Sequence, residues 1–327
     1  MPTTPEPHQR IAKLLARAGV ASRREIERMI AEGRVQLNGE ALTTPATVLP
    51  SLEGVTVDGQ PVAEPEAARL FVFHKPAGVL TAERDFSGRR TIYDCLPPGL
   101  PRLVPVGRLD LNTEGLLLLT TDGGLKRRLE LPSTGVERAY RARAYGQVSQ
   151  PQLEELIDGV EIEGVRYGSI DANIERRTGA NVWIELILTE GKNREVRRVL
   201  EHLGLRVSRL IRTRYGPFVL ADLPEGAIGE VRDGDVATLR RLLEKGRALG
   251  TAEGVIAVAP IGPMARPPRP ARSPRPAGST PAKPAAPTKA APALAETPAR
   301  PAKLVRKAGW AKPKPKTGPA RSRKPRT

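Results

Sequence analysis

The C-terminal quarter of the chain limits any folded structure to about the first 250 residues. Residues 251–327 hold 17 of the 33 prolines, and they contain 17 Lys or Arg but only two acidic residues. Runs such as Pro281-Ala-Lys-Pro-Ala-Ala-Pro cannot bury enough apolar surface to offset the entropy lost on ordering. We therefore predict a disordered, basic, Pro/Ala/Lys/Arg-rich tail over 249–327 and a short disordered start over 1–7.

The same segment carries nearly all of the net charge. The chain of 327 residues has a formal charge of +17, but residues 1–250 hold 36 basic against 34 acidic residues. The folded part is therefore almost neutral and long enough for two domains. The tail is expected to add salt-sensitive attraction to RNA phosphates. A neutral solubilising extension is the alternative.

Several classes of protein are excluded by composition. The single cysteine, Cys95, rules out an intramolecular disulfide framework and fits a reducing compartment. Charges at Glu6, Arg10, Lys13 and Arg17 interrupt any signal peptide, and no apolar run reaches the roughly 20 residues of a membrane span. Three histidines without a pair at ligand spacing argue against a metal centre. We expect a cytoplasmic, metal-free protein with a polyanionic partner and no membrane.

Residues 8–66 form a candidate small module. Ile11, Leu14 and Leu15 have the spacing of an amphipathic helix, and Ser22-Arg-Arg-Glu25 has the pattern of a capping box that opens a second one. Asn38-Gly39 follows a short strand-like run and predicts a hairpin turn. Basic residues of the two helices gather on one side, which indicates RNA binding, although a solvated helix surface would show the same pattern.

This module resembles an S4 RNA-binding domain. The resemblance is carried by Leu14-Leu-Ala-Arg-Ala-Gly-Val-Ala-Ser-Arg-Arg-Glu and by Gly33-Arg-Val-Gln-Leu-Asn-Gly. It implies a set of RNA-contacting residues: Lys13, Arg17, Arg23, Arg24, Arg34 and Asn38.

Residues 67–248 read as a second domain of mixed α and β structure. Apolar runs at 70–73, 116–119, 182–188 and 207–211 predict strands, and helical patterns cover 151–157, 193–203 and about 235–245. Strands outnumber helices and the turns are short, so a mostly antiparallel sheet is expected. The fold class is therefore α+β: a small module followed by a larger domain with a mostly antiparallel mixed sheet.

The most unusual local sequence is Gly107-Arg-Leu-Asp-Leu-Asn-Thr-Glu-Gly, a polar loop that runs directly into an apolar strand. Asp110 in this loop is either a catalytic carboxylate or the cap of its own turn. From Asn193 a predicted helix places Arg197 at the edge of its apolar face, from which it could meet Asp110 and hold the carboxylate ionised and fixed. An ordinary surface helix would also explain that pattern.

A tyrosine is the third candidate site residue, after Asp110 and Arg197. In Arg138-Ala-Tyr140-Arg-Ala-Arg-Ala-Tyr145, alternation places Tyr140 on the apolar face of a strand and Tyr145 on the other face with Arg141 and Arg143. Tyr140 is thus directed at a core or a cleft, and plain core packing is its alternative role.

Together these pieces resemble the catalytic domain of the RsuA/RluB-type pseudouridine synthases, bacterial enzymes with an N-terminal S4 domain. The matching stretches are His74-Lys-Pro-Ala-Gly-Val, the block from Gly107 to Thr120, Glu137-Arg-Ala-Tyr140, Glu190-Gly-Lys-Asn-Arg-Glu-Val-Arg-Arg and Val207-Ser-Arg-Leu-Ile-Arg-Thr-Arg-Tyr-Gly-Pro217. They look most similar to the large-subunit branch of the family. The resemblance implies isomerisation of a uridine to pseudouridine in ribosomal RNA, a reaction that needs no cofactor. It also implies 23S rRNA as the substrate and a monomeric protein.

The resemblance also implies residue roles. Asp110 would be the catalytic aspartate, Arg197 would hold it, and Tyr140 would stack on the extruded uracil. Arg108, Leu210, Lys75 and Asn193 would contact substrate, with Arg108 filling the place that the flipped base leaves in the RNA stack. Three other interpretations stay open: a 16S rRNA enzyme of the same family, a non-catalytic rRNA-binding assembly factor acting on a pre-ribosomal particle, and a glycosidase that would need Glu114 as its second acid.

Overall fold

The structure is a computed structural model that describes residues 8–245, 249 and 254–261. The predicted disorder of 1–7 and of most of the tail lies outside these residues. The N-terminal elements are β1 (Gln9–Arg10), α1 (Ile11–Arg17), α2 (Arg23–Ala31), β2 (Val35–Leu37), β3 (Glu40–Ala41), β4 (Val48–Leu49), β5 (Val55–Val57) and β6 (Gln60–Pro61). Their strands form a four-stranded sheet in the order β3-β2-β5-β6 and a separate pair of β1 with β4.

The two helices and this sheet enclose their own apolar cluster, which includes Ile11, Leu15 and Ile26. Ser22 caps α2 as predicted, because its side chain accepts a hydrogen bond from the Glu25 amide at 3.2 Å. The Glu25 carboxylate, however, accepts from Arg28 one turn later rather than reaching back to complete the predicted box. Asn38 and Gly39 both have positive φ, at 52° and 87°, as the predicted hairpin turn between β2 and β3 requires.

The larger part of the chain is built on one nine-stranded sheet. Its main path runs β13-β14-β10-β15-β9-β7-β17, with β16 paired to β15 and β8 paired to β9. Every pairing is antiparallel except that of β15 with β9, so the predicted mostly antiparallel mixed sheet is confirmed. Its nine strands are β7 (Leu70–Lys75), β8 (Val104–Pro105), β9 (Glu114–Thr120), β10 (Arg138–Tyr145), β13 (Ile170–Thr178), β14 (Asn181–Leu188), β15 (Arg206–Tyr215), β16 (Phe218–Val219) and β17 (Ile228–Glu230). The remaining strands of this part are β11 (Val160–Ile162) and β12 (Val165–Tyr167).

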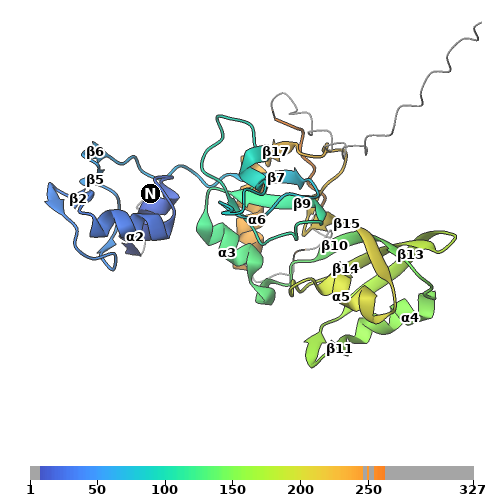
Figure 1. Cartoon of the computed structure of the whole chain (residues 1–327). Helices are drawn as coiled ribbons and strands as arrows, with labels where there is room; N and C mark the ends of the chain where they lie inside the picture. Colours follow the sequence, from blue (N-terminus) through green and yellow to red (C-terminus); the bar gives the residue numbers. More distant parts are fainter. Residues whose placement is uncertain (1–7, 246–248, 250–253, 262–327) are drawn as a thin grey trace, which may run out of the picture. The chain divides into compact units, whose positions relative to one another are not determined.

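Helices cover different strands of this sheet (Figure 1). Helices α3 (Gly123–Glu130) and α6 (Asp233–Glu244) share an apolar cluster with β7 and β9. Helices α4 (Gln150–Glu154) and α5 (Glu195–His202) share another with β10, β13, β14 and β15. The short 3-10 turns are η1 (Ile92–Cys95), η2 (Pro132–Thr134) and η3 (Glu155–Asp158), and β11 and β12 form a separate hairpin.

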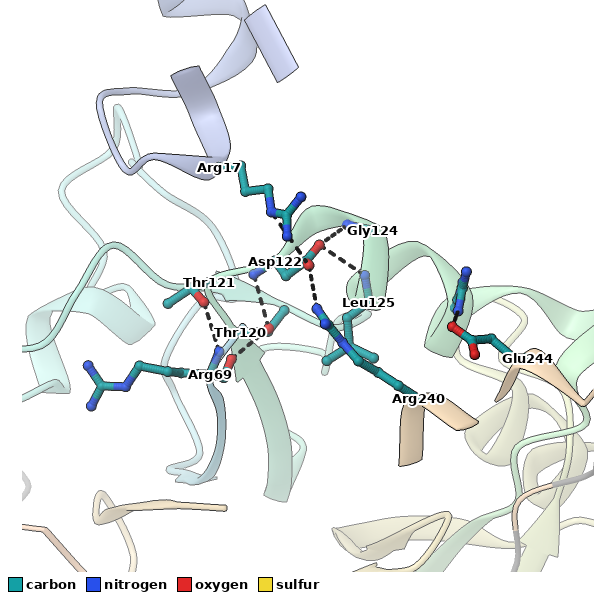
Figure 2. Close-up of polar contacts among 10 residues, drawn as sticks. Arg17, Arg69, Thr120, Thr121, Asp122, Gly124, Leu125, Arg240 and Glu244 are labelled. Atoms are coloured by element: carbon teal, nitrogen blue, oxygen red, sulfur yellow. Dashed lines mark hydrogen bonds and ion pairs between the residues drawn. The ribbon is translucent and has the colours of Figure 1, made fainter. Parts of the chain in front are cut away.

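Asp122 connects α3 to its surroundings (Figure 2). Its Oδ1 accepts from the amides of Gly124 and Leu125 at 2.6 and 3.2 Å, which caps α3. Its Oδ2 accepts from Arg240 of α6 at 2.7 Å and lies 4.0 Å from Nε of Arg17. The sequence pattern did not predict α3, because Gly123-Gly124 reads as a helix breaker; the Asp122 cap explains why a helix begins there.

The described structure also corrects the predicted end of the folded part. Leu249 is fully buried, and the amide of Val219 donates to the carbonyl of Ile256 at 3.0 Å. The amide of Ile261 donates to Ile228 at 2.7 Å. The physical reason is a short apolar run in 254–261, which an average composition over the last 77 residues conceals. No helix of the described residues is long and apolar enough to cross a membrane.

Candidate active site

Asp110 lies in the loop that connects β8 to β9. The Thr113 amide donates to the Asp110 carbonyl at 3.1 Å, so the loop closes in a tight turn. The Asp110 side chain is 33% exposed. Its carboxylate is therefore open to a substrate while the backbone beneath it is fixed.

The cation beside Asp110 is Arg194. Its Nη1 lies 3.7 Å from Oδ2 of Asp110. Arg194 is the residue before α5 and has a left-handed backbone conformation, with φ of 52°. The predicted helix began at Asn193, whereas the observed helix starts at Glu195, so Arg194 precedes the helix and its side chain does not follow the helical phase.

Arg197 holds the same loop by its backbone. Its Nη2 donates to the carbonyl of Asn112 at 2.9 Å, and its Nη1 donates to Val207 at 3.4 Å. Only 8% of Arg197 is exposed, and burial, followed by the nearby charge of Arg194, lowers its pKa. The expected pairing of Arg197 with Asp110 is therefore replaced by two contacts: Arg194 with the carboxylate and Arg197 with the loop.

Lys75 at the end of β7 is fully buried. Its ammonium donates to the carbonyls of Pro76, Leu111 and Thr113 at 2.9, 3.3 and 3.0 Å. Burial lowers the pKa of Lys75 to about 8. Two of its three N–H groups thus hold the Asp110 loop, at Leu111 and Thr113, and the third holds the neighbouring Pro76. The contact of Lys75 with substrate stays a prediction.

Two other residues define the same loop. Thr81 holds it from another side: its hydroxyl donates to the Leu109 carbonyl at 3.0 Å and faces the Leu109 amide at 3.3 Å. Arg108 is exposed, and no contact with the described residues restrains its side chain. The structure therefore presents Arg108 next to Asp110 as a free cation.

Gly115 brings the two halves of the sheet together directly after the loop. Its φ is +105°, and a Cβ there would lie 2.2 Å from the carbonyl oxygen of Arg212. Gly115 pairs with Arg212 in the one parallel contact, between β9 and β15. Only glycine permits this approach, which fixes the Asp110 loop against the strand that carries Leu210.

The predicted substrate residues occupy different environments. Tyr140 is half-buried and packs against both the cluster under α5 and the cluster of β7 and η1, so its role at the substrate stays a prediction. Leu210 is only 4% exposed and belongs to the first of these clusters. Asn193 is exposed just before α5.

The predicted RNA-contacting residues of the N-terminal part are mostly accessible. Lys13, Arg23, Arg24 and Asn38 are exposed. Arg34 is half-buried, and its guanidinium forms two hydrogen bonds of 2.7 Å to the Asp58 carboxylate.

Glu114 does not provide a free second acid. Its carboxylate is bound by Arg209 through contacts of 2.8 to 3.2 Å. The glycosidase interpretation needs a second carboxyl group that is free to contact the sugar next to Asp110, whereas the Glu114 carboxylate is occupied by Arg209. The described residues also contain no group of three or more His, Cys, Asp or Glu side chains that could hold a metal ion.

Sequence reasoning missed Arg194 and Thr81 as site residues. Arg194 is adjacent to the predicted helix, so a recognised helix start at Glu195 would have revealed it. Nothing in the local sequence around Thr81 signals a contact with Leu109, because the two residues are brought together only by the fold.

Comparisons with known proteins agree with the two resemblances. A family model described as RNA pseudouridylate synthase matches residues 69–202, and an S4 domain model matches residues 9–51. An uncharacterized RNA pseudouridine synthase of Rickettsia bellii is 44% identical over 223 residues, which are 68% of this chain and 96% of that protein.

Two further similarities concern a named enzyme and a solved structure. Ribosomal large subunit pseudouridine synthase B of Salmonella typhi is 43% identical over 244 residues, covering 72% of this chain and 84% of that protein. A crystal structure of pseudouridylate synthase is 25% identical with a TM-score of 0.51, covering 70% of this chain and 99% of that one. The family resemblance and the fold class inferred from the sequence are therefore confirmed.

Proposed function

Because this chain belongs to the RNA pseudouridine synthase family, we propose that it isomerises a uridine of large-subunit (23S) ribosomal RNA and that Asp110 is its catalytic carboxylate. The large-subunit assignment is supported by the relatives of Pasteurella multocida and Salmonella typhi that are named ribosomal large subunit pseudouridine synthase B. The S4 match supports RNA as the partner.

The reaction breaks the bond between N1 of uracil and C1′ of the ribose and forms a bond between C5 and C1′. C5 loses its hydrogen as a proton and N1 gains one, so atoms and electrons balance without an oxidant or a reductant. One carboxylate suffices, either as a nucleophile or as the base that starts glycosidic cleavage. Both paths place the Asp110 carboxylate at the sugar.

The observation that carries the proposal is the way in which the Asp110 loop is held. Lys75, Thr81 and Arg197 bind its backbone from three elements, while the carboxylate stays accessible beside Arg194. Such fixed positioning of a reactive group, with a cation 3.7 Å away, is what catalysis by one carboxylate requires.

The neighbouring residues support extrusion of the target base. In the proposal, Tyr140 stacks on the uracil, Leu210 backs the pocket, and Asn193 lies at its edge. The exposed Arg108 fills the vacated place in the RNA stack. Extrusion costs a few kcal/mol and costs least in loops and bulges, so an irregular element of the rRNA is the expected target. Lys13, Arg23 and Arg24 of the S4 domain would bind another part of the same RNA.

Tritium release tests this assignment directly. Transcripts of large-subunit and small-subunit rRNA that contain 5-tritiated uridine are incubated with the full chain. Release from the large-subunit transcript alone supports the proposal, and release from the small-subunit transcript alone assigns the enzyme to 16S rRNA. Binding without release, with free rRNA and with pre-ribosomal particles, would mean a non-catalytic assembly factor.

A further inference from the structure

The side of the sheet opposite α4 and α5 carries an unusual row of residues. Arg176 of β13, Trp183 of β14, Arg143 of β10 and Arg209 of β15 lie directly opposite one another on four neighbouring strands. The adjacent row contains Asn181, Tyr145 and Arg206. We call this set the rear Arg-aromatic face, defined as Arg143, Tyr145, Arg176, Trp183, Arg206 and Arg209.

Alternation and burial place these side chains away from the helices. Val182, Ala142 and Ala144 are fully buried in the cluster under α4 and α5, so their strand neighbours point to the other side. Arg143, Arg176 and Arg206 are exposed, and Tyr145 is 51% exposed. No described segment covers this face.

Three of the four arginines on this face lack the ion pairs that Arg209 and the neighbouring Arg141 form. Arg141 is held by Glu175 at 2.6 Å, and Arg209 is held by Glu114 at 2.8 Å. By contrast, Arg143, Arg176 and Arg206 form no ion pair with any described residue. Arg143 of β10 also lies directly opposite Arg209 of β15, and like charges at such positions are unfavourable unless they are compensated. An anionic ligand would compensate the charges of Arg143, Arg176 and Arg206, which no described carboxylate pairs with.

The aromatic residues indicate which anion fits. The Arg206 guanidinium lies 5.5 Å from the centre of the Tyr145 ring, and Arg141 lies 5.3 Å from that of Trp183. Arginines that bind phosphates, interleaved with rings on which bases stack, are the usual surface for single-stranded RNA. An acidic protein would use the arginines but not the exposed Tyr145. The basic C-terminal tail has the wrong charge to occupy this face.

We propose that the rear Arg-aromatic face binds a single-stranded segment of the substrate RNA, on the side of the sheet away from α5. Four strands about 4.8 Å apart give the row a length of roughly 14 Å, which suits a short stretch of RNA backbone. This proposal rests on RNA being the substrate, but not on the chemistry at Asp110. The face would therefore raise affinity without taking part in the reaction.

The test uses the full chain with both Arg143→Gln and Arg176→Gln. Binding to an unmodified large-subunit rRNA transcript is measured over a salt series. We expect about tenfold weaker binding at low salt and a log Kd against log salt slope smaller by about 1.4, since each phosphate contact on single strands contributes about 0.7. The KM for tritium release should rise while kcat stays unchanged.

The matched control removes two exposed arginines elsewhere, Arg127→Gln of α3 and Arg241→Gln of α6. Affinity and salt slope equal to those of this control would overturn the proposal. Arg143 and Arg176 are exposed and pair with no described carboxylate, so their replacement should leave the melting temperature nearly unchanged, and a folding failure would be visible as a lower one. In that case ultraviolet crosslinking of the unaltered chain decides: an RNA adduct on Tyr145 or Trp183 supports the proposal, and its absence contradicts it.

The two proposals fail in different ways. RNA binding that depends on Arg143 and Arg176, without tritium release, would contradict the catalytic assignment alone. Normal turnover with unchanged affinity in the double variant would contradict only the rear face.

Discussion

Nη1 of Arg194 lies 3.7 Å from Oδ2 of Asp110, whereas Arg197 donates to the carbonyl of Asn112 in the same loop. Two arginines three positions apart at the start of α5 therefore act on different parts of one loop. Arg194 faces the charge of the carboxylate, and Arg197 fixes the backbone that carries it.

Replacement of Arg194 should affect the chemical step. We expect Arg194→Gln to lower kcat by about tenfold or more, because the ion pair, partly exposed in the free protein, contributes more once bound RNA excludes water from it. Arg194→Lys should recover part of the loss, and KM should change little. Arg198→Gln, exposed on the same helix, is the control. Equal kcat values for Arg194→Gln and Arg198→Gln would remove Arg194 from the site.

Replacement of Lys75 should affect both stability and turnover. Lys75→Met leaves the carbonyls of Pro76, Leu111 and Thr113 without their shared donor. We expect the free energy of unfolding to fall by roughly 2–4 kcal/mol, since an unsatisfied buried polar group costs about 1–3 kcal/mol. Urea denaturation measures this, with exposed Lys13→Met as the control. A reduced kcat with unchanged RNA affinity would identify Lys75 as a positioning residue; normal kcat in the folded variant would refute that role.

Gly115 should tolerate no side chain. A Cβ at this residue would lie 2.2 Å from the Arg212 oxygen, and φ is +105°. We expect Gly115→Ala to destabilise the chain by about 3 kcal/mol or more, because overpacking and backbone strain add. Gly123→Ala, which meets nothing within 4 Å, should change stability by less than about 0.5 kcal/mol. Similar melting temperatures for the two variants would contradict the close strand approach.

Stability should depend on pH through Glu195. Burial raises the pKa of this carboxyl from 4.5 to about 7, with the nearby Glu190 acting in the same direction. Between these values the folded state binds more protons than the unfolded state, so stability should fall as pH rises from 4.5 to 7. Glu195→Gln should remove this decrease. Urea unfolding at pH 5 and pH 7.5 measures both, and an equal pH dependence in the two proteins would show that Glu195 does not cause it.

The sequence predicted elements whose periodicity is local. The spacing of Ile11, Leu14 and Leu15 located α1, and the alternation around Tyr140 assigned both faces of β10. It could not predict how distant loops bind one another. Lys75 was predicted only as a substrate contact, because the carbonyls of Leu111 and Thr113, which its ammonium binds, are more than 30 residues away in the sequence.

Helix boundaries caused the other difference at the site. A helix that starts at Asn193 makes Arg197 the nearest cation to Asp110, whereas a start at Glu195 makes it Arg194. The positive φ of Arg194 depends on packing that no local pattern encodes. The apolar run at 254–261 was missed for a different reason. The average composition of 251–327 is rich in proline, and these eight residues change that average little.

The most direct test of the central claim is tritium release by Asp110→Asn, measured beside binding to the same large-subunit rRNA transcript. This substitution keeps the size of the side chain and removes its charge and nucleophilicity. We predict RNA affinity within about twofold of that of the unaltered chain and no release above background, because every path through this site needs the carboxylate. Release above background by a folded Asp110→Asn protein would contradict the account.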